Sequence, residues 1–201
     1  MQRKCIKISN MEGATMIQTK SRTHSLILRA LFAALIAVGA FIRIPIPVVP
    51  FTLQYLFTML AGLLLGSKQG AASVLVYTLV GLTGFPIFTE GGGLSYVLKP
   101  SFGYIIGFIV GAYVTGAIAN AVPFPSYRRT LTANVAGLGI VYLFGMVYYY
   151  MISHLYLGTG IGLWPLFLYC FILAVPGDIL LCILASVVAK PLSRALNSKH
   201  T

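Results

Sequence analysis

The stretch Phe102–Val122 decides the class of fold: it reads FGYIIGFIVGAYVTGAIANAV and contains no charged residue. An apolar run of about 17 to 25 residues is long enough to cross the hydrocarbon core of a bilayer as a helix. Gly103, Gly107 and Gly111 recur at intervals of four residues, which places them on one face of such a helix. Because small residues allow a neighbouring helix to approach closely, this stretch predicts a membrane helix packed inside a bundle.

Further apolar runs lie on both sides of this stretch. Of the 201 residues, 58% are hydrophobic and 8% are charged, whereas a soluble domain has roughly 25% charged residues. We therefore expect an all-α integral membrane protein, a bundle of six transmembrane helices. The six predicted spans are Ser25–Ile42, Phe51–Leu65, Gly70–Phe88, Phe102–Val122, Leu131–His154 and Ile161–Ala189. This division makes residues 25–195 a membrane domain, residues 1–24 a flexible cytoplasmic leader and residues 196–201 a cytoplasmic tail.

The basic residues lie mostly on one side of the membrane if consecutive spans cross it in alternating directions. One side receives Arg43 and Lys99, and the other receives the remaining 12 of the 14: Arg3, Lys4, Lys7, Lys20, Arg22, Arg29, Lys68, Arg128, Arg129, Lys190, Arg194 and Lys199. Loops rich in Lys and Arg stay in the cytoplasm. We expect a multi-pass protein of the cell membrane with both termini in the cytoplasm. The net charge of +11 does not indicate a nucleic-acid partner, because the basic residues are dispersed over short segments.

One carboxylate is predicted to lie at membrane depth. Asp178 follows Pro176 and Gly177 inside the last apolar run, and ionisable residues at such depth mark functional sites. The Pro-Gly pair predicts a break, with a helix beginning at Ile179 and Asp178 at its N-cap. A capping carboxylate can also accept a hydrogen bond from a ligand, so both roles remain open.

The segment between the third and fourth spans contains three consecutive glycines. Gly91, Gly92 and Gly93 follow Glu90, and glycines let backbone N–H groups come close to a ligand. The segment is too apolar for a solvated linker. It predicts a lid folded over the bundle, with a plain tight turn as the alternative.

The first span has small residues at helical spacing: Ala30, Ala33, Ala34 and Ala37. Such a stripe lets another helix approach closely. Internal packing and docking to another subunit explain it equally well.

The sequence lacks the common catalytic motifs. It has neither a phosphate-binding Gly-x-x-x-x-Gly-Lys-Ser/Thr motif nor a Gly-x-Ser-x-Gly nucleophile motif. The three His and three Cys residues show no metal-ligand spacing. We therefore expect no enzyme activity, no cofactor and no metal.

Four motifs together resemble the BioY family. They are Ile44–Gln54 (IPIPVVPFTLQ), Gly84–Phe88 leading into the glycines, Lys99–Tyr104 and Pro176–Asp178. The family comprises the biotin-specific substrate-capture subunits (S-components) of energy-coupling factor (ECF) transporters. The resemblance implies a six-helix S-component bundle that captures biotin from outside. It also implies that the alanine stripe docks on a transmembrane coupling (T) subunit and that two cytoplasmic ATPases supply the energy.

The chemistry of biotin assigns roles to the candidate residues. An ionised Asp178 can accept a hydrogen bond from a ureido N–H, and aromatic side chains suit the bicyclic ring. For the carboxylate, Lys99 is the first candidate, Arg43 the second and the backbone N–H groups of Gly91–Gly93 the third. The family commonly has a lysine one turn after the aspartate, where this chain has Leu181. The full set of predicted ligand-binding residues is Arg43, Phe51, Thr52, Gln54, Glu90, Gly91, Gly92, Gly93, Lys99, Tyr104, Tyr142 and Asp178.

Three other functions remain as alternatives. The chain could be an S-component for another vitamin or a self-contained secondary carrier. A membrane-embedded enzyme is disfavoured because pairs of catalytic residues are missing.

Overall fold

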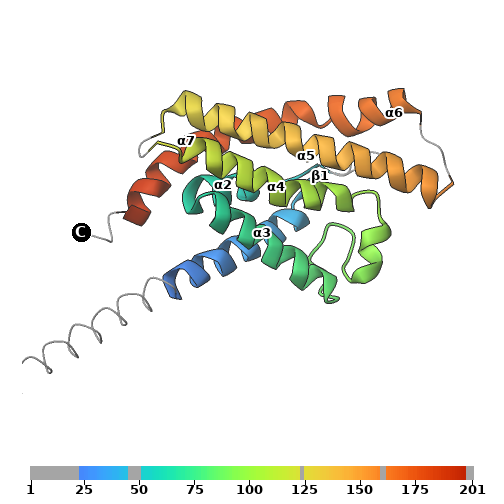
Figure 1. The fold of residues 1–201 in the computed structure, drawn as a ribbon, viewed down its shortest axis with the longest axis horizontal. Helices are drawn as coiled ribbons and strands as arrows, with labels where there is room; N and C mark the ends of the chain where they lie inside the picture. The colour runs from blue at the N-terminus through green and yellow to red at the C-terminus, as the bar shows by residue number, and fades with distance from the viewer. Residues whose placement is uncertain (1–22, 45–50, 123–124, 159–161, 198–201) are drawn as a thin grey trace, which may run out of the picture.

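The structure, a computed structural model, describes residues 23–44, 51–122, 125–158 and 162–197. The described part is mostly helical (Figure 1). Most of the predicted leader, residues 45–50 of the first family motif and residues 198–201 of the predicted tail lie outside it. In chain order the elements are a first helix Thr23–Phe41, β1 (Arg43–Ile44), β2 (Phe51–Thr52), α2 (Gln54–Leu65), α3 (Ser67–Leu82), η1 (Leu94–Leu98), α4 (Phe102–Ala119), α5 (Tyr127–Leu155), α6 (Leu163–Phe167), the π-helical turn η2 (Leu168–Ile172) and α7 (Val175–Asn197).

Four helical stretches of the described residues are long and apolar enough to cross a membrane. They are Thr23–Phe41, Phe102–Ala119, Tyr127–Leu155 and Trp164–Ser193. The second and third predicted spans contain shorter helices, α2 with 12 residues and α3 with 16. Each predicted span therefore contains helix, but the count of six crossings stays a prediction.

The glycine face of α4 packs against α5, as predicted. A Cβ atom at Gly103 would lie 2.3 Å from the Cβ atom of Tyr148, and one at Gly107 would lie 2.9 Å from the Cα atom of Val141. No side chain fits at these positions without moving α5. The close contact of α4 with α5 therefore depends on glycine, which has no side chain, at these two positions.

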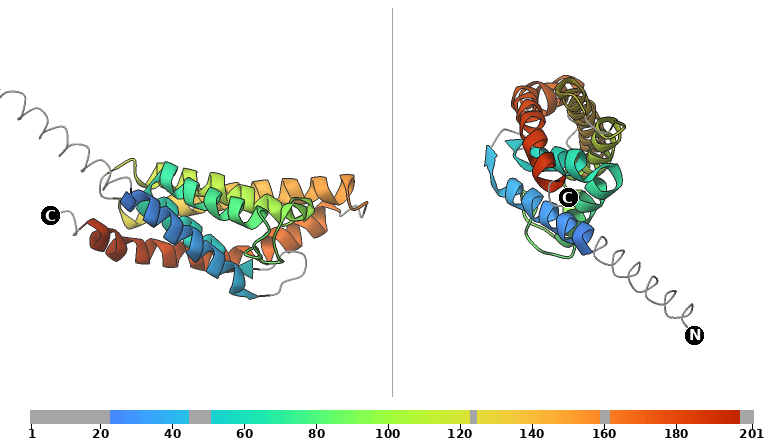
Figure 2. Two further views of the ribbon diagram at one scale, coloured as in Figure 1. Left: turned by 90° about the horizontal axis from the view of Figure 1, so that it is seen from below. Right: turned by 90° about the vertical axis from the view of Figure 1, so that its left-hand side faces the viewer.

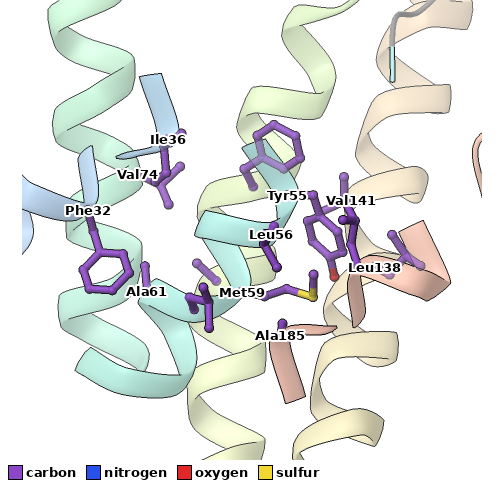
Figure 3. Packing of buried hydrophobic residues seen from close by; sticks show 14 of the residues in the cluster. Phe32, Ile36, Tyr55, Leu56, Met59, Ala61, Val74, Leu138, Val141 and Ala185 are labelled. Carbon is purple, nitrogen blue, oxygen red and sulfur yellow. The ribbon is translucent and has the colours of Figure 1, made fainter. Parts of the chain in front are cut away.

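The core joins the first helix to the rest of the bundle (Figure 3). Phe32 and Ile36 of the first helix are buried, and they belong to one apolar cluster with residues of α2, α3, α5 and α7. The residues labelled in Figure 3 are Phe32, Ile36, Tyr55, Leu56, Met59, Ala61, Val74, Leu138, Val141 and Ala185.

The third predicted span extends too far. Helix α3 ends at Leu82 rather than at Phe88, because Gly84 has a φ of +111°, which ends the helical path. Phe88 then folds back on α3, where a Cβ atom at Gly81 would lie 2.2 Å from the Phe88 ring. The apolar character of Phe88 reflects this buried contact.

The last predicted span is interrupted before the aspartate. Helix α7 begins at Val175 and not at Ile179, and the Asp178 N–H donates to the Ala174 carbonyl at 3.1 Å. Pro176 fits in the first turn because backbone N–H groups there need no partner within the helix. Asp178 therefore lies in the first turn of α7, and the prediction of an N-cap before Ile179 was wrong.

The first helix begins, and α7 ends, at the same end of the bundle (Figure 2). At this end, Arg129 donates to the Ile118 carbonyl at 2.8 Å and Arg29 donates to the Gln69 side chain. These bonds tie α5 to α4 and the first helix to α3.

Candidate functional site

A cavity lies between the helices, with a wall from the loop that precedes α4. Side chains from β2, α2, α4, α5, α7 and this loop contribute to it. Its lining residues are Phe51, Thr52, Gln54, Tyr55, Thr89, Tyr96, Ser101, Tyr104, Ile105, Phe108, Val141, Tyr142, Cys170, Ala174 and Asp178. Six of the predicted ligand-binding residues meet there: Phe51, Thr52, Gln54, Tyr104, Tyr142 and Asp178.

A tyrosine–aspartate pair forms one side of the cavity. The Tyr142 hydroxyl of α5 donates a hydrogen bond to Oδ2 of Asp178 in α7. The Tyr142 ring meets the Tyr104 ring edge-on, with 6.3 Å between centroids. The pair thus presents a carboxylate beside aromatic surfaces.

Two short strands position the polar side chains at a second side. In the β1–β2 pair, Thr52 lies opposite Arg43. The Thr52 hydroxyl donates to Oε1 of Gln54 at 3.2 Å. Nε2 of Gln54 in turn donates to the Tyr77 hydroxyl at 2.7 Å, and Tyr77 donates to the Ile87 carbonyl at 3.1 Å. This chain of hydrogen bonds fixes the Gln54 amide.

The glycine of the Pro-Gly-Asp motif makes room for an aromatic ring. A Cβ atom at Gly177 would lie 2.7 Å from the Phe51 ring, and Phe51 lines the cavity. The motif therefore places an aspartate and an aromatic surface next to each other.

Three hydroxyl groups that sequence reasoning missed form a third side of the cavity. Oγ1 of Thr89 lies 2.9 Å from the Tyr96 hydroxyl oxygen, and the Ser101 hydroxyl donates to Tyr96 at 3.2 Å. All three residues line the cavity, and Tyr96 is buried. We call Thr89, Tyr96 and Ser101 the hydroxyl cluster.

The remaining charged candidates lie in an adjoining hollow. Arg43, Glu90, Gly91 and Lys99 line it, and Thr89 lines both spaces. Nζ of Lys99 is 3.3 Å from Oε2 of Glu90 and donates to the Glu90 carbonyl at 2.9 Å. Nη1 of Arg43 donates to the Thr89 carbonyl at 2.5 Å. Both cations therefore hold the loop that separates the hollow from the cavity.

The glycine segment forms a tight turn that is tied back to the end of α3, and its role as a lid stays a prediction. Phe88 and Gly91 exchange two backbone hydrogen bonds, of 2.9 and 3.3 Å, and Gly91 has a φ of +115°. The Gly93 N–H donates to the Gly81 carbonyl at 2.8 Å, and the Phe85 carbonyl fills the space where Gly92 would have a side chain. Gly92 and Gly93 thus shape the loop and line neither space.

The alanines of the first helix face in different directions. Ala33 is buried, Ala37 is partly buried, and Ala30 and Ala34 are exposed. Among the described residues, no three His, Cys, Asp or Glu side chains gather in a way that could hold a metal ion.

Comparison with known proteins finds relatives that are named as biotin transporters. A probable biotin transporter BioY of Lysinibacillus sphaericus is 44% identical over 176 residues, which cover 88% of this chain and 90% of the relative. The biotin transporter BioY of Thermotoga maritima is 44% identical over 124 residues, which cover 61% of this chain and 72% of the relative.

A solved structure has the same fold. It is the crystal structure of the S-component for biotin from an ECF-type ABC transporter, and it matches this chain with a TM-score of 0.74 at 28% identity. The match covers 87% of this chain and 93% of the other. The model of the BioY family matches residues 11–198. The chain is therefore a member of the BioY family.

Proposed function

We propose that this chain is the biotin-binding S-component of an ECF transporter, which captures biotin outside the cell and delivers it inward. The observation that carries the proposal is Asp178, a carboxylate in an aromatic cavity of a BioY family member. Membership of a family of membrane transporters confirms the expectation that the chain is not an enzyme.

The cavity suits the bicyclic ring of biotin. One oxygen of Asp178 accepts from Tyr142, so the other is left to accept a ureido N–H. A hydrogen bond to a charged group contributes about 1.5–3 kcal/mol. Phe51, Tyr104 and Tyr142 would pack against the thiophane ring, and Thr52 and Gln54 would offer polar contacts to the ureido group.

The biotin carboxylate would lie toward the loop side of the cavity. Lys99 and Arg43 line the hollow that adjoins that side, and backbone N–H groups at Gly91–Gly93 are a further possibility. Leu181, at the position of the family's usual lysine, has an aliphatic side chain, so it provides no charge.

Delivery into the cell would require partners. We propose that exposed Ala30 and Ala34 dock on a transmembrane T subunit and that two cytoplasmic ATPases drive transport. Six crossings with both termini in the cytoplasm fit this role, and the common end of the first helix and α7 supports an even number of crossings. We expect the chain to need no cofactor.

Competition binding tests the proposed ligand. Purified protein in detergent should bind radiolabelled biotin, and excess unlabelled biotin should displace the label whereas riboflavin, thiamine and folate should not. Displacement by another vitamin at lower concentration than biotin would assign the chain to that vitamin.

Uptake by liposomes tests the mode of transport. Liposomes that contain this chain together with the T subunit and the ATPases should accumulate biotin when ATP is present. If the chain alone accumulates biotin in response to a proton gradient, it is a secondary carrier instead.

A further inference from the structure

The carboxylate of the ligand needs a partner inside the cavity, and the described cations do not supply one directly. Lys99 is paired with Glu90, and Arg43 is bound to the Thr89 carbonyl. Neither residue lines the cavity that contains Asp178; both line the adjoining hollow. A direct ion pair with either cation would therefore form in the hollow, outside the cavity that contains Asp178.

The hydroxyl cluster, in contrast, lines the cavity itself. Its three hydroxyl groups provide three donors, and the Ser101 hydroxyl is used within the cluster because it donates to Tyr96. If Thr89 also donates to Tyr96, across their 2.9 Å separation, the Tyr96 O–H is left to donate to a ligand. A hydroxyl that accepts two hydrogen bonds becomes a stronger donor, because neighbouring hydrogen bonds polarise one another.

The two cations lie directly behind this cluster. Nζ of Lys99 is 5.2 Å from the centroid of the Tyr96 ring, and Arg43 is bound to the backbone of Thr89. Glu90 offsets the charge of Lys99, whereas Arg43 is bound to a neutral carbonyl, so the charge of Arg43 makes the loop side of the cavity favourable for an anion. Asp178 makes the α7 side favourable for hydrogen-bond donors. The cavity is therefore polarised, with a carboxylate and a hydroxyl cluster supplied by different elements.

We propose that the Tyr96 hydroxyl donates a hydrogen bond to the carboxylate of the ligand, that the Thr89 and Ser101 hydroxyls orient Tyr96 by donating to it, and that Arg43 gives electrostatic support from behind the cluster. This inference rests on the proposed function, and it deepens that function by assigning the carboxylate-binding group. It makes Tyr96 a determinant of specificity for the free acid over its neutral derivatives.

Binding of a charged ligand and of its neutral derivative distinguishes carboxylate binding by Tyr96 from a purely structural role of this residue. The dissociation constants of biotin and of its neutral methyl ester are measured for the full chain and for Tyr96→Phe. The native protein should prefer biotin to the ester by about tenfold or more, the effect of one charge-assisted hydrogen bond. Tyr96→Phe should remove this preference by weakening biotin binding, and it should leave ester binding unchanged.

Control variants complete the test. Tyr113→Phe removes a hydroxyl from an exposed tyrosine of α4, so it should leave both dissociation constants unchanged. If Tyr96→Phe does not fold, Thr89→Val and Ser101→Ala replace it, and each should reduce the preference for biotin. Asp178→Ala should weaken both ligands equally, because both contain the ureido ring.

Other outcomes overturn the inference. Equal loss of both ligands in Tyr96→Phe would make Tyr96 structural, and an unchanged preference in all three variants would exclude the cluster. Loss of the preference in Lys99→Gln alone would assign the carboxylate to a direct ion pair with Lys99. If the native protein binds neither ligand, the proposed function itself fails, and the inference fails with it.

Discussion

At the scale of single residues, the Tyr142 hydroxyl determines how Asp178 meets a ligand. It occupies Oδ2, so the carboxylate is held in one orientation and a single oxygen remains for a ureido N–H. Asp178→Ala should weaken biotin binding at least about tenfold, because the lost bond involves a charged group. Equilibrium binding of radiolabelled biotin measures the effect. An unchanged dissociation constant would remove Asp178 from the site.

The Tyr142→Phe variant tests how much the orientation of the Asp178 carboxylate contributes to binding, apart from its charge. The variant keeps the aromatic surface and the carboxylate but loses the hydroxyl, so we expect a smaller loss of biotin affinity than in Asp178→Ala. The same binding assay applies to both variants and to their double variant. If the two single effects add in full in the double variant, the two residues act independently and Tyr142 does not position Asp178.

Sequence patterns identified some residues of the cavity and missed others for a clear reason. Asp178 is conspicuous because carboxylates at membrane depth are rare. Thr89, Tyr96 and Ser101 belong to a loop, where hydroxyl residues are common, so the sequence gives no signal that they meet. The pairing of Lys99 with Glu90 was missed as well, since it depends on how the loop folds.

At the scale of the elements, the packing of α4 on α5 depends on glycine. Gly107→Ala would put a Cβ atom 2.9 Å from the Cα atom of Val141, and backbone at this distance cannot yield without shifting a helix. We expect a loss of about 1–3 kcal/mol in stability from overpacking. Thermal unfolding in detergent should show a lower Tm.

Gly139→Ala is the matched control for this prediction. Gly139 lies in α5, and a Cβ atom added there would have no neighbouring atom within 4 Å. Alanine should therefore leave the Tm unchanged or raise it, because alanine favours helix. Equal effects of the two substitutions would show that the α4–α5 contact does not depend on Gly107.

The first helix offers a separate test of docking. Ala34 is exposed, so Ala34→Trp should abolish co-purification with the T subunit and the ATPases while biotin binding by the isolated chain stays intact. Leu180→Trp, at an exposed position of α7, is the control and should retain the complex. Survival of the complex in Ala34→Trp would rule out docking through this position.

The lengths of the elements show which parts of the fold the sequence could predict. The fourth span was predicted to start at Phe102, where α4 starts, because an uncharged run that follows Lys99, Pro100 and Ser101 marks a membrane helix. The last span was less predictable, since the π-helical turn Leu168–Ile172 lies within continuous apolar sequence. Hydropathy reports burial in lipid or protein but does not report a local change of helix type.

At the scale of the whole molecule, the distribution of charge predicts the orientation. A green fluorescent protein fused to the C-terminus should fluoresce in cells, whereas an alkaline phosphatase fused there should be inactive, because both report a cytoplasmic location. The same pair of reporters at the N-terminus should give the same result. Active phosphatase at either end would contradict the predicted orientation.

The most direct test of the central claim is calorimetric titration of the purified protein with biotin, in detergent that keeps the protein folded. The cavity between Asp178 and the hydroxyl cluster predicts heat that saturates at one biotin per chain, with binding complete at micromolar concentrations. No heat at these concentrations, from protein shown to be folded by its unfolding transition, would contradict the assignment as a biotin-binding S-component.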